Sequence, residues 1–158
     1  MHNNVPPVLA FSERLSLFAR RLGALVYDGL LLIALWFAAM IPVVAVTGEH
    51  PGVVARGLTQ LYLFAVGFAF FGGFWTHGGQ TLGLRSWRLR VEDVASGRLR
   101  WARALARYAA AVLSWLPVGL GFIWILVDAQ GRAWHDRLSA TRVVRVASGD
   151  APQQKQRE

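Results

Sequence analysis

The sequence predicts an α-helical membrane protein with three hydrophobic segments and a small cytoplasmic β-structure. Three stretches carry almost no ionisable side chain: residues 22–46 contain only Asp28, and residues 58–75 and 108–127 contain none. A helix of about 20 apolar residues crosses the ~30 Å hydrocarbon core of a bilayer. The 17 basic residues gather on the flanks of these stretches, where Lys and Arg mark the cytoplasmic side of membrane helices.

The composition argues against several function classes. There is no cysteine, so disulfides, thiolate metal sites and cysteine nucleophiles are excluded. The four histidines are scattered and form no HExxH-like pair, so we expect no metal and no cofactor. Membrane topology explains the net charge of +8 more simply than nucleic-acid binding does. Without a nucleophile motif or phosphate loop, we expect no catalytic residues and no enzyme activity.

The chain divides into a membrane domain and two tails. Residues 1–13 are polar and contain proline, so we expect a flexible tail, followed by one domain over residues 14–147. The polar residues 148–158 are expected to be disordered. Apolar side chains recur at helical spacing before the first segment, at Phe11, Leu15, Phe18 and Leu22. They indicate either a short interfacial helix or simply the flank of that segment.

The second apolar segment is rich in glycine and aromatic residues. Its small residues Ala65, Gly67 and Ala69 would let another helix approach closely.

A β-hairpin is predicted after this segment. Residues 84–91 alternate in character, residues 95–97 read Ala-Ser-Gly, and residues 98–101 alternate again. Two period-2 runs around a glycine-containing turn are typical of a hairpin. The β-rich residues 141–146 could add a third strand.

Charge and segment number conflict over topology. Only Arg56 is basic between the first two segments, and the other 16 of the 17 basic residues lie before the first segment, around the predicted hairpin or after the last segment. The positive-inside rule therefore places both termini and the hairpin in the cytoplasm. Three plain crossings would instead put the termini on opposite sides. Pro117 and two glycines interrupt the last segment, and a broken or re-entrant segment would return the chain. We favour the return, because the C-terminal strand needs the hairpin as a partner.

Asp28 is the most informative single residue. A carboxylate inside a membrane helix costs about 2.5–3.5 kcal/mol, so it is a functional candidate by default. Arg21 lies two helical turns away, roughly 10.5 Å along the axis, and its side chain leans away from Asp28. A partner from another segment is therefore expected, with Arg107 and His77 as candidates. Asp28 is either a structural clamp or a proton or cation site.

A second polar cluster, Trp134-His135-Asp136-Arg137, follows the last apolar segment. Adjacent residues point apart along a backbone, which argues against a catalytic His–Asp pair. Asp136 could instead cap its segment or pair with arginines, and His135 is a possible partner in such a cluster.

Several of these features recur together in one known family. They are Arg21 and Asp28, Gln80-Thr81-Leu82-Gly83, Leu89-Arg90-Val91-Glu92-Asp93, Ala106-Arg107, and the run from His135 to Val144. This ordered set resembles the RDD family of membrane proteins, which is named for one arginine and two aspartates. The resemblance extends over residues 20–146. A departure, Ser86-Trp87-Arg88, is inserted before the strand and leaves the hairpin register open.

The resemblance implies that Arg21, Asp28 and Asp136 are the named residues, with Asp93 as the alternative for the third. It also implies a membrane location, while the family's molecular function is generally unassigned and transport is suggested.

The sequence therefore predicts a multi-pass protein of the cell (inner) membrane with both termini cytoplasmic. We expect a structural or assembly component that works as a homo-oligomer or with a membrane-protein partner. Its basic cytoplasmic face would bind anionic lipid headgroups. The alternative is an oligomeric ion or small-solute transport component that uses Asp28.

Overall fold

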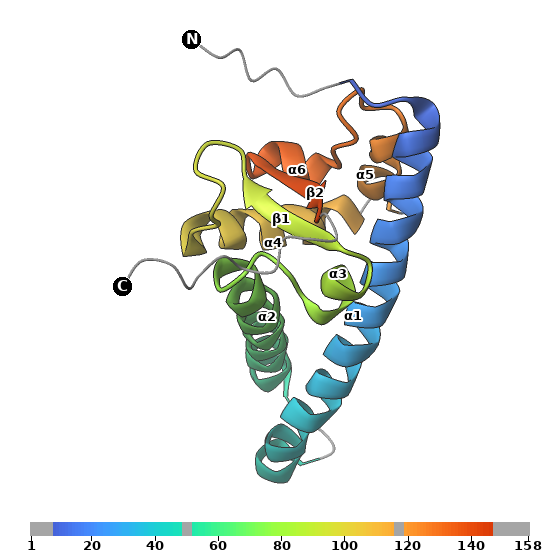
Figure 1. Cartoon of the computed structure of the whole chain (residues 1–158). Coiled ribbons are helices and arrows are strands. Elements are labelled where there is room, and N and C mark those ends of the chain that lie inside the picture. The colour runs from blue at the N-terminus through green and yellow to red at the C-terminus, as the bar shows by residue number, and fades with distance from the viewer. Residues whose placement is uncertain (1–7, 49–51, 116–118, 147–158) are drawn as a thin grey trace.

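A computed structural model describes residues 8–48, 52–115 and 119–146. Its elements in chain order are α1 (Phe11–Thr47), α2 (Val53–Thr76), α3 (Leu82–Ser86), β1 (Leu89–Asp93), α4 (Trp101–Trp115), α5 (Leu120–Ile123), the 3-10 helix η1 (Trp124–Leu126), α6 (Trp134–Leu138) and β2 (Thr141–Arg145). Helix α1 runs the whole length of the molecule and α2 returns beside its second half (Figure 1). The remaining elements lie at the end where α1 begins, so they form a head on a two-helix stem.

The two-helix stem consists of long apolar helices. Helix α1 has 37 residues and is about 55 Å long at ~1.5 Å per residue. Among the described residues, α1 and α2 are long and apolar enough to cross a membrane, and a third span results if residues 101–115 and 120–126 are one bent span. The Trp36 indole donates to the carbonyl of Leu63 over 2.9 Å, which ties the two stem helices together.

Helix α1 begins earlier than the sequence suggested. The Glu13 carboxylate accepts a hydrogen bond from the backbone N–H of Ala10 over 2.9 Å, which satisfies an N–H that the first turn would leave unpaired. Residues 11–13 therefore belong to the helix rather than to a tail. The helix continues without interruption through Arg21, which favours the flank over a separate interfacial helix. The remaining tail residues, 1–7 and 148–158, lie outside the described residues.

The predicted hairpin is wrong, whereas the C-terminal strand is confirmed. Residues 82–86 form helix α3, and α4 begins at Trp101 where the second hairpin strand was expected. Strand β1 instead pairs antiparallel with β2 in a two-stranded sheet, with Val91 opposite Val143. Thr81 explains the helical start, because its hydroxyl caps α3 by accepting from the backbone N–H of Leu84 over 3.2 Å.

The last apolar segment is interrupted, as the sequence indicated. Helix α4 ends at Trp115, and the pair α5–η1 lies at 112° to it. The proline of the predicted break is in residues 116–118, outside the described residues. Helix α4 runs across the end of α2 rather than alongside it (Figure 1). Its inner face and neighbouring elements build a core of Trp75, Val91, Leu99, Ala104 and Tyr108.

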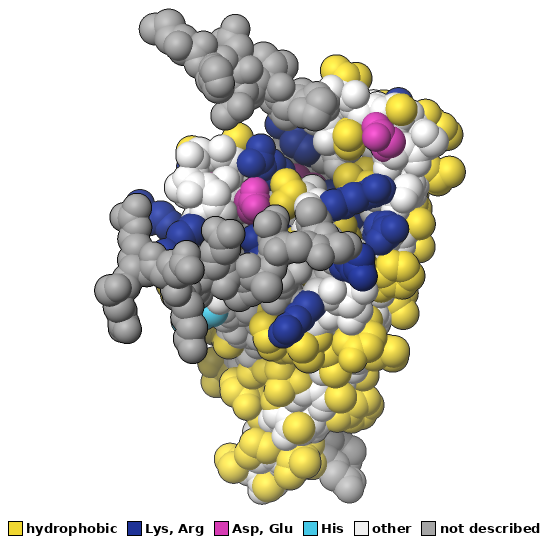
Figure 2. Space-filling view, in the orientation of Figure 1, with side chains coloured by type: hydrophobic (Ala, Val, Ile, Leu, Met, Phe, Trp, Pro, Cys, Tyr) yellow, Lys and Arg dark blue, Asp and Glu magenta, His cyan; other side chains and the backbone are white. Residues whose placement is uncertain are grey.

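Charge separates along the molecule. On the face shown in Figure 2, arginines gather over the head, and the lower part of the stem is covered by hydrophobic side chains. Exposed large apolar residues continue along α1 from Leu22 to Val46. A soluble surface would rarely leave so long a stripe uncovered, whereas lipid would cover it.

Candidate functional site

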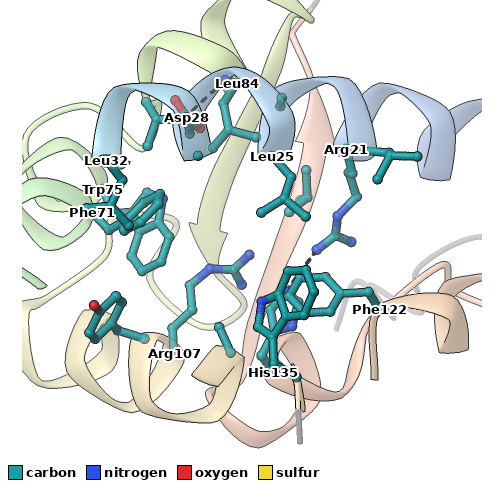
Figure 3. A pocket seen from close by; sticks show the side chains of 18 of the residues that line it. Arg21, Leu25, Asp28, Leu32, Phe71, Trp75, Leu84, Arg107, Phe122 and His135 are labelled. Atoms are coloured by element: carbon teal, nitrogen blue, oxygen red, sulfur yellow. Dashed lines mark hydrogen bonds between the residues drawn. The ribbon is translucent and has the colours of Figure 1, made fainter. Parts of the chain in front are cut away.

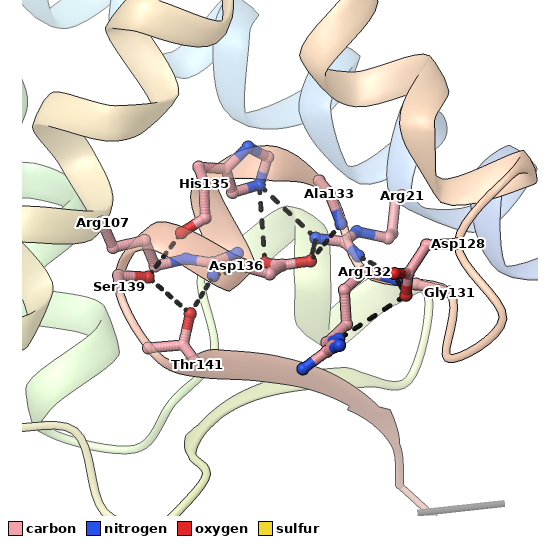
Figure 4. Close-up of polar contacts among 10 residues, drawn as sticks. All are labelled: Arg21, Arg107, Asp128, Gly131, Arg132, Ala133, His135, Asp136, Ser139 and Thr141. Carbon is pink, nitrogen blue, oxygen red and sulfur yellow. Dashed lines mark hydrogen bonds and ion pairs between the residues drawn. The ribbon is translucent and has the colours of Figure 1, made fainter.

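Asp136 lies at the centre of a buried ion cluster in the head. Its Oδ2 accepts from Nη2 of Arg21 over 2.6 Å, and its Oδ1 accepts from Nη1 of Arg107 over 2.5 Å. The Asp136 side chain is fully buried, and the two arginine side chains are 10% and 5% exposed. Figure 4 shows the carboxylate between the two guanidinium groups. One carboxylate therefore links α1, α4 and α6.

Local structure fixes the position of this carboxylate. Asp136 is the third residue of α6, and its Oδ2 also accepts the backbone N–H of Ala133 over 2.9 Å. This contact is half of a capping box at the helix start. Burial alone would raise the pKa of Asp136, but Arg21, Arg107 and the Ala133 amide outweigh it and hold that pKa well below its usual range. Asp136 is therefore an anion at physiological pH.

His135 completes the cluster without adding charge. Its Nε2 lies 3.5 Å from Nη2 of Arg21 and 3.6 Å from Oδ1 of Asp136. Burial, which the carboxylate of Asp136 opposes and the two arginines reinforce, lowers the pKa of His135 to about 3. The ring packs against Phe122, with 4.9 Å between ring centroids. His135 is therefore neutral at physiological pH, and the cluster retains one net positive charge.

The Asp136-bound nitrogen of Arg107 also reaches β2. Nη1 of Arg107 donates to the Thr141 hydroxyl over 2.5 Å, and that hydroxyl is 2.8 Å from the Ser139 hydroxyl. These hydroxyls connect the ion cluster to the sheet.

Asp28 forms a separate buried site on α1. The Thr81 hydroxyl donates to Oδ2 of Asp28, and the backbone N–H of Gly83 donates to Oδ1 over 2.8 Å. A Cβ added at Gly83 would lie 2.4 Å from the carbonyl oxygen of Ala24, so only glycine allows α3 this close to α1. Asp28 thus anchors the start of α3 against α1.

The partners of Asp28 differ from the two candidates named from the sequence. Among the described residues, its hydrogen bonds come from Thr81 and Gly83, and neither Arg107 nor His77 supplies one. Arg107 binds Asp136 instead. His77 is exposed at the end of α2, where its Nδ1 lies 2.8 Å from the carbonyl of Gly73. Both donors favour the charged form of the carboxylate, although neither of them carries a charge.

The other aspartates in the head have local roles. Asp93 accepts the backbone N–H groups of Ala95 and Ser96 and pairs with Arg103 at 3.2 Å. Asp128 holds the turn before α6 by accepting from the backbone N–H of Arg132 over 2.9 Å. Asp93 lies outside the ion cluster, which leaves Asp136 as the acid that Arg21 binds.

The neutral members of both sites belong to the family resemblance, but the sequence predicted no role in the site for them. These are Thr81, Gly83, Ser139 and Thr141. Thr81 could have been found as a helix-capping threonine, but alternation over residues 84–91 favoured a strand there. Thr141 lies at the first position of a strand, where nothing in the sequence marks a contact with α4.

A cavity of about 460 Å³ connects the two sites. It lies between α1 and α4, with Trp75 and Phe71 of α2 on one side and His135 and Phe122 on the other (Figure 3). Arg21, Asp28 and Arg107 all line it. In the part of the chain that the structure describes, no three His, Asp or Glu side chains are grouped to hold a metal ion.

The model of the RDD family matches residues 15–140. The chain belongs to the RDD family. Comparison with curated proteins and with solved structures found no match. The matched range contains Arg21, Asp28 and Asp136. The resemblance implied that these are the one arginine and two aspartates for which the family is named. In this RDD protein the arginine binds the later aspartate, and the earlier aspartate is bound by α3.

Proposed function

We propose that this RDD protein is a non-enzymatic, multi-pass component of the cell membrane with a structural or assembly role. The observation that carries the proposal is the bonding of Asp136, which is fully buried and shared by Arg21 and Arg107. One carboxylate oxygen binds Arg21, which lies 115 residues earlier in the sequence, and the other binds Arg107, which lies 29 residues earlier. A group committed in this way fixes an architecture and is not available for proton transfer.

We also propose that both termini are cytoplasmic. The described chain starts and ends in the head, opposite the end of α1 and the start of α2 (Figure 1). This arrangement supports two crossings by the stem, with α4 and α5–η1 returning at the head. A cytoplasm-specific reporter fused to each end should be active in both fusions. A silent C-terminal fusion beside an active N-terminal one would contradict the arrangement.

The head is proposed to contact anionic lipid headgroups through its exposed arginines. Arg85, Arg98 and Arg100 are exposed in the head, and each well-placed basic residue contributes about 1 kcal/mol near an anionic surface. Binding to anionic vesicles should weaken as salt increases. We further propose that the protein acts as a homo-oligomer or with a membrane-protein partner.

A second candidate function is ion or solute transport through Asp28. It is favoured by the position of Asp28 in the wall of the 460 Å³ cavity. Two or three spans are too few to enclose a pathway, so transport would require an oligomer.

A flux assay on reconstituted wild type and Asp28→Asn separates the two functions. No wild-type flux together with a lower melting temperature of Asp28→Asn supports the structural role. Wild-type flux that Asp28→Asn abolishes at an unchanged melting temperature would replace that role with transport.

A further inference from the structure

The cavity between α1 and α4 has the form of a binding site for an amphiphile. Its volume of about 460 Å³ lies within the ~300–1,000 Å³ of small-molecule sites. Its walls are mostly apolar and aromatic, and its polar groups lie deep inside. The lining residues that are exposed at the surface are Leu22, Val112 and Trp115. The mouth is therefore apolar and opens where hydrocarbon would cover α1 and α4.

Arg107 has unused hydrogen-bond donors at this cavity. Within the described part of the chain, its hydrogen bonds to Asp136 and Thr141 both leave from Nη1. Its Nε is buried without a partner, and no bond joins its Nη2 to a described residue. Nε and Nη2 form one edge of the guanidinium, which matches two oxygens of an anionic group. The buried indole N–H of Trp75 also has no acceptor among the described residues, and the Trp75 ring lies under the Arg107 guanidinium at 5.1 Å.

Charge at this end of the cavity favours an anion. Arg21 and Arg107 carry two positive charges against the single negative charge of Asp136, and His135 is neutral. Asp28 is two helical turns, about 10.5 Å, along α1 from Arg21. Its oxygens already accept bonds from Thr81 and Gly83. The anionic head of a ligand would therefore lie at Arg107, whose Nε is buried without a partner among the described residues.

We propose that this cavity binds a long-chain carboxylate that enters from the bilayer. The carboxylate accepts from Arg107, and the apolar chain lies along α1 and α4 toward Leu22, Val112 and Trp115. A compact head is required, because the Arg107 side chain is only 5% exposed. A carboxylate meets this condition, whereas a phospholipid head with its glycerol backbone does not. This inference goes beyond the proposed function and does not depend on transport.

Tryptophan quenching by a brominated long-chain fatty acid tests the proposal in neutral detergent. Trp36, Trp75 and Trp115 line the cavity, so wild type should show saturable quenching. The brominated alcohol of the same chain length should bind roughly 10–100-fold more weakly, because it cannot form charge-assisted bonds. Arg107→Lys keeps the positive charge but loses the paired donors of the guanidinium. It should also weaken fatty-acid binding roughly 10–100-fold.

Two alanines on α4 provide matched variants. Ala111 lines the cavity, whereas Ala106 is exposed and does not. Ala111→Phe should abolish saturable quenching at an unchanged melting temperature, and Ala106→Phe should bind as wild type does. If Ala111→Phe melts lower, the comparison of acid with alcohol on wild type still decides the question.

Four results would overturn the proposal. The alcohol, or a brominated anionic phospholipid, could bind as tightly as the acid. A correctly folded Ala111→Phe could retain saturable quenching. Asp28→Asn could abolish fatty-acid binding while Arg107→Lys preserves it, which would show that Arg107 does not hold the carboxylate.

Discussion

At the scale of single residues, the stability of the head depends on charge compensation at Asp136. Two guanidinium groups and one backbone amide converge on this fully buried carboxylate. Because neither arginine has another carboxylate within the described cluster, each relies on Asp136 for its desolvated charge.

Asp136→Asn should therefore strongly destabilise the protein. The substitution leaves two buried positive charges facing a neutral amide, and breaking a buried pair costs about 3–5 kcal/mol. Chemical unfolding in detergent, followed by circular dichroism, would measure the loss. The control is Glu92→Gln, which removes an exposed pair with Arg142 at 3.3 Å and should cost less than about 1 kcal/mol. Equal losses of stability in the two variants would contradict the structural role of Asp136.

Acid should destabilise the head through His135 before it protonates Asp136. The pKa of His135 falls from 6.5 to about 3 on folding, so between these values the unfolded chain binds more protons. Stability should decrease as pH falls below 6.5, by at most about 1.4 kcal/mol per pH unit. The stabilisation from Asp136, whose pKa is lowered by folding, is lost only below pH 3.8.

Melting temperatures measured between about pH 7.5 and 4.5 would check whether stability decreases on acidification. His135→Gln should flatten the profile in this range, whereas His77→Gln, at an exposed position, should retain the wild-type profile. A wild-type melting temperature that rises on acidification would show that His135 gains its proton within the fold.

The charged residues of the site were predictable from the sequence, but their hydrogen-bond partners were only partly predictable. Asp28 stands out because a charge inside an apolar segment is costly, whereas Arg21 and Asp136 were assigned from the resemblance to the RDD family. Helical geometry also excluded a direct Arg21–Asp28 pair. The partner of Asp28 was not predictable from charge, because Thr81 and Gly83 are neutral and act through a hydroxyl and a peptide N–H.

At the scale of elements, close packing of α4 on α2 depends on Gly67. A Cβ at this position would lie 2.3 Å from the Tyr108 hydroxyl oxygen and 3.3 Å from its Cζ. The small residues of α2 were expected to allow close approach of another helix, and at Gly67 that helix is α4.

Gly67→Ala should destabilise the protein by about 1–3 kcal/mol, because overpacking forces neighbours apart. Tyr108→Phe removes the atom in closest contact, so the double variant should recover much of this loss. Unfolding free energies of the two single variants and the double variant would give the coupling. Gly73→Ala is the control on the same helix, because its Cβ would meet nothing within 4 Å. Additive effects at positions 67 and 108 would contradict the contact.

Element prediction succeeded for the long apolar helices and for the C-terminal strand, and failed for the local hairpin. Uninterrupted apolar stretches indicated α1 and α2. The alternation of residues 84–91 misled, because so short a run is also compatible with a helical turn followed by a strand. The predicted pairing of the C-terminal strand with this region is confirmed, because β1 pairs with β2 and Val91 lies opposite Val143.

At the scale of the whole molecule, the separation of charge predicts two opposite aqueous faces. The absence of cysteine means that a single introduced thiol reports its own position. Ala95 is exposed in the head, and Gly52 is exposed at the start of α2.

In sealed cells, a membrane-impermeant maleimide should label Gly52→Cys directly and Ala95→Cys only after permeabilisation. The expected difference follows from the proposed cytoplasmic location of the basic head. Labelling of both positions in intact cells would contradict a structure that crosses the membrane by its stem. Denatured samples of each variant serve as controls for thiol reactivity.

The shared carboxylate also imposes an order on biosynthesis. Arg21 is made 115 residues before Asp136, which corresponds to roughly 6–23 s at the usual ~5–20 residues per second of translation. During that interval α1 enters the bilayer without its counter-ion, and Arg107 emerges equally uncompensated. The head therefore closes only when Asp136 has been made, so a ribosome that stalls between codons 107 and 136 leaves an inserted stem with two unneutralised arginines. Such a fragment would be a distinct substrate for membrane quality control.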